Sequence, residues 1–164
     1  MKPQDIVVLA KLIAYDDPSY TQMELSLSLE MSQSEISSSL KRSTYAGLLI
    51  NKGQDVERKL FFDFIQFGLP VIFPVHPGAI VRGTVTAHSA EPLAMEFLSD
   101  EKYVWPYAKG RDRGQSITPL YPTVPKAVII DPNLHELLAL LDAVRVGRAR
   151  EKNRALEILE ARIC

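Results

Sequence analysis

A serine-rich segment, residues 31–49, combines small hydroxyl side chains with an amide and two adjacent cations. Its sequence, MSQSEISSSLKRSTYAGLL, places Ile36, Leu40 and Leu48 at helical spacing. Because a helix has 3.6 residues per turn, an amide, three hydroxyls and one cation then lie on the side opposite these apolar residues. A second cation follows directly in the sequence. These residues are Gln33, Ser34, Ser37, Ser38, Lys41 and Arg42. They can donate and accept hydrogen bonds, and the two cations can bind anions.

That combination suits the surface of double-stranded DNA. Small hydroxyls let a helix approach base edges closely, and glutamine can pair with adenine. Lys41 and Arg42 would lie where the phosphate backbone passes. Serine is an indifferent helix former, so a helix that exposes serines gives up some helix propensity for close approach. We therefore predict a recognition helix. The alternative is that the serines are tolerated in solvent and the Lys-Arg pair only adds solubility.

Two helix-start signatures support the prediction. Residues 21–24, TQME, and residues 32–35, SQSE, both match the capping box. In that motif the hydroxyl accepts from the third helical amide, and the glutamate accepts from the amide of the capping residue. Their separation predicts a short helix with Leu25 and Leu29 inward, a turn around residues 30–31, and a longer second helix. This spacing is typical of a helix-turn-helix.

The stretch QMELSLSLEMSQSEISSSLKRSTYAGLL resembles the DNA-binding domain of winged-helix bacterial transcriptional regulators, in the broad MarR-like group. The resemblance covers residues 4–50. Ser26 stands at the small-residue position, and Glu30 stands where such turns often carry glycine. The resemblance implies sequence-specific binding of double-stranded DNA by a transcriptional regulator. It also implies a β-hairpin wing, but the few residues over 50–55 leave room only for a short wing or none.

The whole chain is predicted to be α+β, in three parts. Residues 1–68 form the helix-turn-helix domain, which begins with an amphipathic helix from Gln4 to Tyr15. A helix with a wide apolar face closes this part over 56–67, and Gly68 and Pro70 are expected to end it.

Residues 69–130 form a small β-containing region. Its β-prone runs are PVIFPV, AIVRGTVTA, KYVWPY and KAVII, and its loop KGRDRG is predicted to be a basic tip. Three aromatic residues and two arginines here could form a pocket for a protein partner or a small effector. These residues are Trp105, Tyr107, Tyr121, Arg111 and Arg113. The interpretation that the sequence favours is a small aromatic core beside an arginine-bearing surface loop.

Residues 131–164 form C-terminal helices, either one kinked helix or two helices that meet at Gly147. Their leucines, Leu134 to Leu141 with Leu156, Leu159 and Ile163, predict a seam between two copies of the chain, and hence a homodimer. The alternative is a monomer in which these faces cover the protein's own core. The arginine-rich run DAVRVGRAREKNRA leaves three interpretations open: a phosphate contact, a dimer contact or a solvated face.

No pattern for catalysis is present. His76, His88 and His135 lack the spacing of metal ligands, and the single cysteine, Cys164, cannot complete a zinc site with them. There is no glycine-rich phosphate loop and no nucleophile elbow. We therefore expect no enzyme activity, no metal and no cofactor.

The charge balance sets a limit on nucleic-acid binding. The formal net charge is −1, and residues 1–60 hold seven Lys and Arg against eight Asp and Glu. A DNA-binding surface must therefore be a local patch. Near-neutral charge also favours a different class, a protein-interaction module such as an antitoxin or adaptor on a helix-turn-helix scaffold. The lack of a membrane-length apolar run and of a signal-peptide pattern leads us to expect a cytoplasmic protein with no membrane contact.

Overall fold

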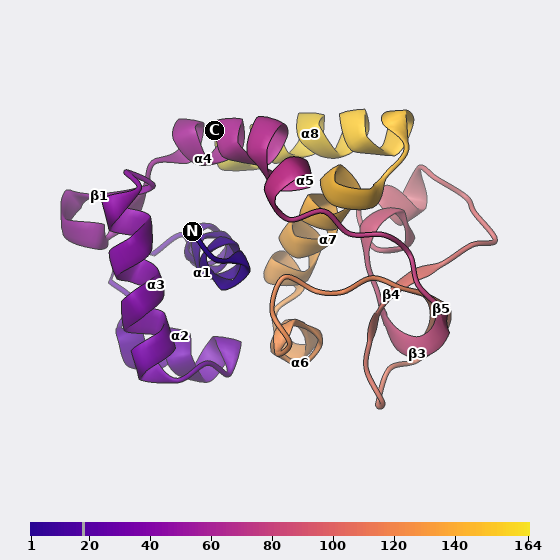
Figure 1. The fold of residues 1–164 in the computed structure, drawn as a ribbon, viewed down its shortest axis with the longest axis horizontal. Helices are drawn as coiled ribbons and strands as arrows, with labels where there is room; N and C mark the ends of the chain where they lie inside the picture. The colour runs from indigo at the N-terminus through magenta and orange to yellow at the C-terminus, as the bar shows by residue number, and fades with distance from the viewer. Residues whose placement is uncertain (18) are drawn as a thin grey trace.

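Helix α1 (Pro3–Tyr15) lies at the centre of the fold, with α2 and α3 on one side and α7 on the other (Figure 1). The computed structural model describes residues 1–17 and 19–164. The amphipathic helix expected over residues 4–15 is confirmed, but its residues 5–13 are all buried. A helix that is buried on every side must be apolar almost all round, which suits the run IVVLA.

Both capping boxes are confirmed. Helix α2 (Gln22–Leu29) begins after Thr21 and helix α3 (Gln33–Tyr45) begins after Ser32, and each hydroxyl accepts from the amide of the glutamate three residues later. The turn between the helices needs a left-handed residue, because Glu30 has φ 52° and ψ 41°. That geometry explains why such a position commonly carries glycine.

A short β-hairpin follows α3. Strands β1 (Leu49–Ile50) and β2 (Asp55–Val56) pair antiparallel, with Leu49 opposite Val56. The three residues 51–53 that form the turn all have positive φ. Of the two outcomes expected after residue 49, a short hairpin or none, the chain forms the short hairpin.

The helix after the hairpin runs further than expected. Helix α4 (Arg58–Asp63) continues through a π-helical turn (Phe64–Gly68) into α5 (Leu69–Ile72). The prediction that Gly68 and Pro70 end the helix is wrong, and so is the strand expected at PVIFPV. Pro70 lies in the first turn of α5, where its missing amide hydrogen is tolerated.

The middle region closes into a small three-stranded barrel. Strand β3 (Ile80–Val85) pairs antiparallel with β4 (Tyr103–Pro106) and with β5 (Asp112–Ser116), and β4 pairs parallel with β5. The runs AIVRGTVTA and KYVWPY are therefore confirmed as strands.

Glycines allow this barrel to close. A Cβ atom at Gly83 would lie 1.9 Å from the Trp105 carbonyl oxygen, and one at Gly110 would lie 2.2 Å from the Gly83 carbonyl oxygen. A Cβ atom at Gly114 would lie 2.4 Å from the Lys102 carbonyl oxygen. No side chain fits at such distances, so the strands can approach only where the residue is glycine.

The fourth β-prone run, KAVII, is helical. It spans the end of α6 (Val124–Ala127) and a 3-10 turn (Val128–Ile130), so the strand prediction is wrong there. Pro125, in the first turn of α6, cannot donate to a strand ladder but suits the start of a helix.

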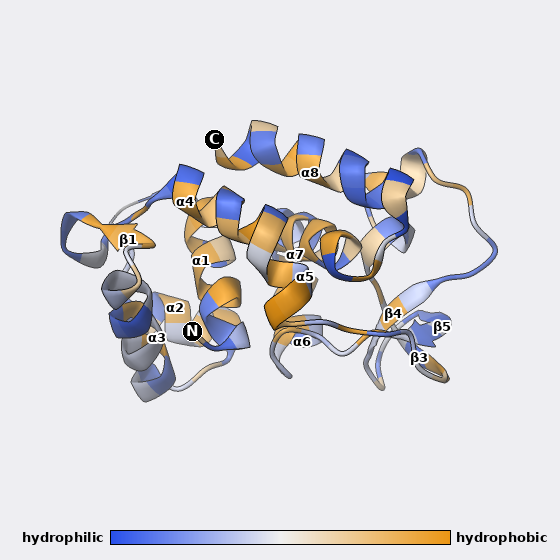
Figure 2. Ribbon diagram, turned by 45° about the horizontal axis from the view of Figure 1, so that its top comes forward, coloured by the Kyte–Doolittle hydropathy of each residue, from blue (hydrophilic) through white to orange (hydrophobic). Residues whose placement is uncertain are grey.

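The C-terminal segment forms two helices, α7 (Pro132–Val146) and α8 (Ala149–Ile163), separated at Gly147. Their apolar faces point into the protein's own core: Leu159 is fully buried and Ile163 is 2% exposed. Figure 2 shows the apolar stripe of α8 facing the rest of the chain, with its polar side outward. These residues are therefore unavailable to a second copy, so the dimer seam expected at Leu159 and Ile163 is wrong, because these side chains cover the protein's own core.

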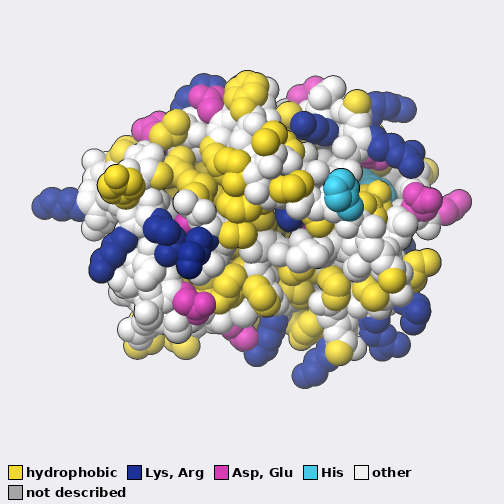
Figure 3. All heavy atoms as spheres, viewed as in Figure 1, with side chains coloured by type: hydrophobic (Ala, Val, Ile, Leu, Met, Phe, Trp, Pro, Cys, Tyr) yellow, Lys and Arg dark blue, Asp and Glu magenta, His cyan; other side chains and the backbone are white. Residues whose placement is uncertain are grey.

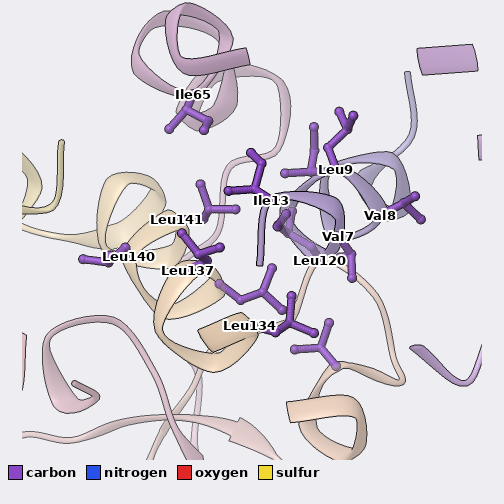
Figure 4. Packing of buried hydrophobic residues seen from close by; sticks show 14 of the residues in the cluster. Val7, Val8, Leu9, Ile13, Ile65, Leu120, Leu134, Leu137, Leu140 and Leu141 are labelled. Atoms are coloured by element: carbon purple, nitrogen blue, oxygen red, sulfur yellow. The ribbon is translucent and has the colours of Figure 1, made fainter. Parts of the chain in front are cut away.

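One core joins all three expected parts. Figure 4 shows Ile13 of α1 directed toward Leu137 and Leu141 of α7, with Ile65 above them and Leu120 near α1. Residues 1–68 thus share their core with the rest of the chain. Within the described residues, no helix has the length and apolar character needed to cross a membrane.

Candidate nucleic-acid interface

One side of α3 fixes the helix to the protein. Ile36 and Ser39 are fully buried and Ser43 is 1% exposed, all toward the core. Because α3 packs on α1, small serine side chains at 39 and 43 let the two helices approach closely. Their hydroxyls have no hydrogen-bond partner among the described residues. Two of the serines in the serine-rich helix therefore pack in the core. Because serine is polar, the sequence alone did not indicate that they are buried.

The other side of α3 faces solvent. Gln33, Ser34, Ser38 and Lys41 are exposed and Ser37 is half-buried, so the outward orientation predicted for this set is confirmed. The Gln33 amide nitrogen lies 3.0 Å from the Met23 sulfur. A helix face with one amide, several hydroxyls and one cation can approach a groove of DNA without steric hindrance.

Arg42 has a different environment from Lys41. Its Nη2 lies 2.6 Å from Oδ1 of Asp5 and its Nε lies 2.9 Å from Oδ2, and the Asp5 side chain is fully buried. Burial raises the pKa of the Asp5 carboxyl, but hydrogen bonds from Arg42 and from the Lys2 amide outweigh it, so the pKa lies below its ordinary value. Arg42 therefore fixes α3 to α1, and Lys41 is the cation of the pair that faces solvent.

A groove with a volume of about 560 Å³ lies beside the exposed face, between α3, the start of α2 and the β-hairpin. Figure 3 shows Lys and Arg side chains over this end of the molecule. Tyr45 is 96% exposed at the end of α3, and Gln22, Lys52 and Gln54 are exposed around the groove. The groove is lined by Tyr20, Gln22, Ser37, Leu40, Lys41, Thr44, Tyr45, Lys52, Gly53 and Gln54.

Sequence reasoning missed the residues outside α3 because they lie in separate segments. Tyr20 precedes α2, yet its hydroxyl donates to the Gly53 carbonyl at 2.7 Å and so fixes the hairpin turn beside α3. Burial, together with the nearby Asp55 carboxylate, raises the pKa of Tyr20. No local pattern marks these residues in the sequence, because only the packing of the hairpin beside α3 brings them together.

Residues 121–126 contact the α2–α3 pair through side-chain hydrogen bonds and an ion pair. The Tyr121 hydroxyl donates to Glu35 of α3, and the Thr123 hydroxyl donates to the Leu29 carbonyl at 2.7 Å. Lys126 lies 2.7 Å from Glu30. The bond from Tyr121 lowers the pKa of Glu35. These contacts set the orientation of α3 relative to the barrel.

Trp105 does not line a pocket, as one of the two interpretations of this region required, because it lies in the core. That side chain is 1% exposed, and its Nε1 donates to Oδ2 of Asp142 at 2.6 Å. Tyr107 is half-buried, and Arg111 and Arg113 are exposed at the barrel surface. This arrangement corresponds to the favoured interpretation of an aromatic core, but the loop expected over KGRDRG ends at Arg111, because Arg113 lies in strand β5.

A buried polar network fixes the barrel to α7. Asp142 accepts from Thr86 at 2.8 Å as well as from Trp105, and Arg145 Nη1 lies 2.6 Å from its Oδ1. Burial raises the pKa of Asp142, while Arg145, Thr86 and Trp105 act to lower it. The His135 Nε2 lies 2.8 Å from the Val85 carbonyl. The side chains of Asp142, Arg145 and His135 therefore make hydrogen bonds inside the protein and have a structural role.

Over residues 1–17 and 19–164, no three His, Cys, Asp or Glu side chains converge in a way that could hold a metal ion. No family model matches the chain, and neither curated proteins nor solved structures give a match. What the site can do must therefore be argued from its geometry.

Proposed function

We propose that the chain is a sequence-specific DNA-binding transcriptional regulator. In this proposal α2 and α3 form a helix-turn-helix of the MarR-like winged kind, and β1 with β2 forms a short wing. The observation that carries the proposal is the exposed face of α3, where Gln33, Ser34, Ser38 and Lys41 face outward while the inward side is fixed to the core. Gln33 and the serines read base edges, and Lys41 contacts a phosphate.

The groove between α3 and the hairpin supports the proposal with a second set of contacts. Lys52 at the hairpin turn and Lys41 on α3 both border it. A wing beside a recognition helix is placed to contact the adjacent backbone, since phosphate contacts fix the register of a protein on DNA. Tyr45, exposed at the end of α3, extends this surface.

The test compares two variants by selection from a random DNA library. Gln33→Ala is expected to relax base preference at one position, and Lys41→Ala is expected to weaken binding to all sequences while leaving the selected motif unchanged. Lys152→Ala, on α8, is the control of equal charge change. If both α3 variants select the parent motif with parent affinity, the recognition-helix proposal is wrong.

We propose further that two copies pair through the helix α4–α5 and not through the C-terminal helices. Leu60, Phe67, Val71 and Ile72 are 43%, 70%, 76% and 55% exposed. Figure 3 shows a gathering of apolar side chains over α4 and α5. They would supply part of the apolar contact of a standard interface, which buries about 800 Å² on each copy. A second copy related by a two-fold axis would bury this patch, and a regulator that reads two half-sites needs such an axis.

The oligomeric state tests this pairing. The parent is expected to be a dimer by light scattering, and Phe67→Glu with Val71→Glu is expected to be a folded monomer. Ile129→Glu with Ile130→Glu, an exposed apolar pair elsewhere, is the control and should stay dimeric. A monomeric parent overturns the pairing; if that monomer also fails to bind DNA, the protein-interaction module becomes the better proposal, with the same apolar patch as its contact surface.

A further inference from the structure

We propose that the outer face of the barrel, formed by β3 and β5, is a second phosphate-binding surface, whose ligand is the phosphodiester backbone of DNA. This inference rests on the proposed function. It assigns binding of the phosphodiester backbone to residues that lie far from α3 in the sequence. Figure 3 shows Lys and Arg side chains gathered at the lower right of the molecule, over the region of β3 and β5.

The strand register brings two arginines together. Arg82 on β3 is the direct antiparallel partner of Arg113 on β5. Direct partners in a sheet point to the same side, with Cβ atoms about 5 Å apart, and two like charges in that arrangement are destabilising. Both side chains are exposed. An anion bound between the two guanidinium groups would relieve their repulsion.

The neighbouring loop adds cations and little negative charge. Lys109 and Arg111 are exposed in the loop before β5. The one acidic residue of that loop and strand, Asp112, has Lys102 at 2.6 Å as its partner. Among the described residues, Arg82, Lys109, Arg111 and Arg113 form no ion pair.

The chemistry of the pair suits phosphate. Guanidinium groups present a planar fork of donors that matches the oxygens of a phosphate, and they stay charged at any physiological pH. Arg82 and Arg113 point from a rigid strand pair, so they lose less freedom on binding than arginines on a mobile loop would lose. The barrel itself is held against α7 by the Thr86 and Trp105 bonds to Asp142.

The charge at α3 explains why a second surface is needed. Arg42 is paired with Asp5, which leaves Lys41 as the outward cation of the Lys-Arg pair, with Lys52 at the hairpin. DNA-binding proteins commonly neutralise several phosphates. A molecule whose net charge is −1 must therefore supply further cations as a local cluster, and the barrel face provides one.

The experiment measures DNA affinity over a salt series for the parent and for Arg82→Gln with Arg113→Gln. Fragments from upstream of the protein's own gene and scrambled fragments are compared. The double variant is expected to bind both more weakly, with an unchanged ratio between them, and the slope of log K against log salt should fall by about one unit per arginine. Arg150→Gln with Lys152→Gln on α8 removes equal charge and should leave the slope near that of the parent.

The outcomes separate the two proposals. If the parent binds no DNA, the proposed function fails and this inference fails with it. If the parent prefers its upstream fragment and the double arginine variant keeps the parent slope, only the barrel surface is overturned. A thermal stabilisation of the parent by inorganic phosphate, absent in the variant and without any change in DNA binding, would assign the pair to a small anion and also overturn the inference.

Discussion

The fully buried carboxylate of Asp5 on α1 accepts three hydrogen bonds from the guanidinium of Arg42 on α3, of 2.6, 2.9 and 3.2 Å. Residues 37 positions apart in the chain are thus paired at the point where the proposed recognition helix meets the core. The exposed Lys41, the next residue along α3, is free of this constraint. The Lys-Arg pair therefore divides into one cation that orients the helix and one that faces solvent.

Replacement of Arg42 is expected to destabilise the protein. Arg42→Gln leaves the Asp5 carboxylate buried without its charged partner, which typically costs about 3 to 5 kcal/mol. Lys41→Gln, the adjacent control, should change the free energy of unfolding by no more than about 0.5 kcal/mol. Urea unfolding of the two variants gives both values; equal values would contradict a structural role for the ion pair.

The same pair predicts a pH dependence. The pKa of Asp5 is lowered in the folded state, so its contribution to stability is present above the unfolded value, near pH 4, and is lost as the pH falls through the folded pKa. In Arg42→Gln the effect of burial remains and favours the protonated carboxyl. The difference in unfolding free energy between parent and variant should therefore shrink when the pH is lowered from 7 to 4. A difference that is constant with pH would contradict the prediction.

The two capping hydroxyls should contribute similar stability. Thr21→Ala and Ser32→Ala each remove the acceptor for a helix amide, which typically costs about 1 kcal/mol. Ser34→Ala, an exposed serine in the first turn of α3 that makes no cap hydrogen bond, serves as the control and should be near neutral. Chemical denaturation midpoints measure all three; parent-like midpoints for both cap variants would show that the caps do not stabilise the helices.

Loss of the Asp142 carboxylate should uncouple the barrel from α7. Asp142→Ala leaves the Arg145 guanidinium and the Trp105 indole without their buried partner, with an expected cost of about 3 to 5 kcal/mol. Thr86→Val removes one hydrogen bond and should cost about 1 kcal/mol. Trp105 is the single tryptophan, so its fluorescence during urea unfolding reports this region directly. Similar losses in the two variants would contradict a central role for Asp142.

Closure of the barrel predicts a large effect at Gly83. Because a Cβ atom there would overlap the Trp105 carbonyl oxygen, Gly83→Ala should cost more than about 3 kcal/mol. Gly53→Ala tests positive φ without such an overlap, and should cost about 1 to 2 kcal/mol. Thermal unfolding of both variants measures the difference, and a milder effect at Gly83 than at Gly53 would contradict the close approach of the strands.

The sequence predicted the helices whose starts are marked by local chemistry. Thr21 and Ser32 sit in motifs that act within four residues, so the start of each helix could be located without tertiary information. Prediction was wrong where tertiary context decides. Pro70 lies in a helix because proline in a first turn is tolerated. The run KAVII is helical because its β-prone composition does not decide its structure: Ala127 and Val128 are buried, whereas Ile129 and Ile130 are exposed.

The candidate site was predictable only along one helix. The 3.6-residue period placed Gln33, Ser34, Ser38 and Lys41 correctly on the exposed face. The partner of Arg42 lies on another helix, so residue type alone could not show that Arg42 pairs with Asp5. Long-range pairing also produced the Arg82 and Arg113 neighbours, which no local pattern indicates.

Sequence-specific DNA binding is decided by the affinity of the parent for DNA from upstream of its own gene, compared with scrambled DNA of equal length over a salt series. Fluorescence anisotropy of labelled fragments gives both binding constants. We predict that the upstream fragment binds tighter by about three orders of magnitude or more, and that both affinities fall linearly on a log–log plot against salt. Equal affinity for the two fragments at every salt concentration, or no binding to either, would contradict sequence-specific DNA binding by α3.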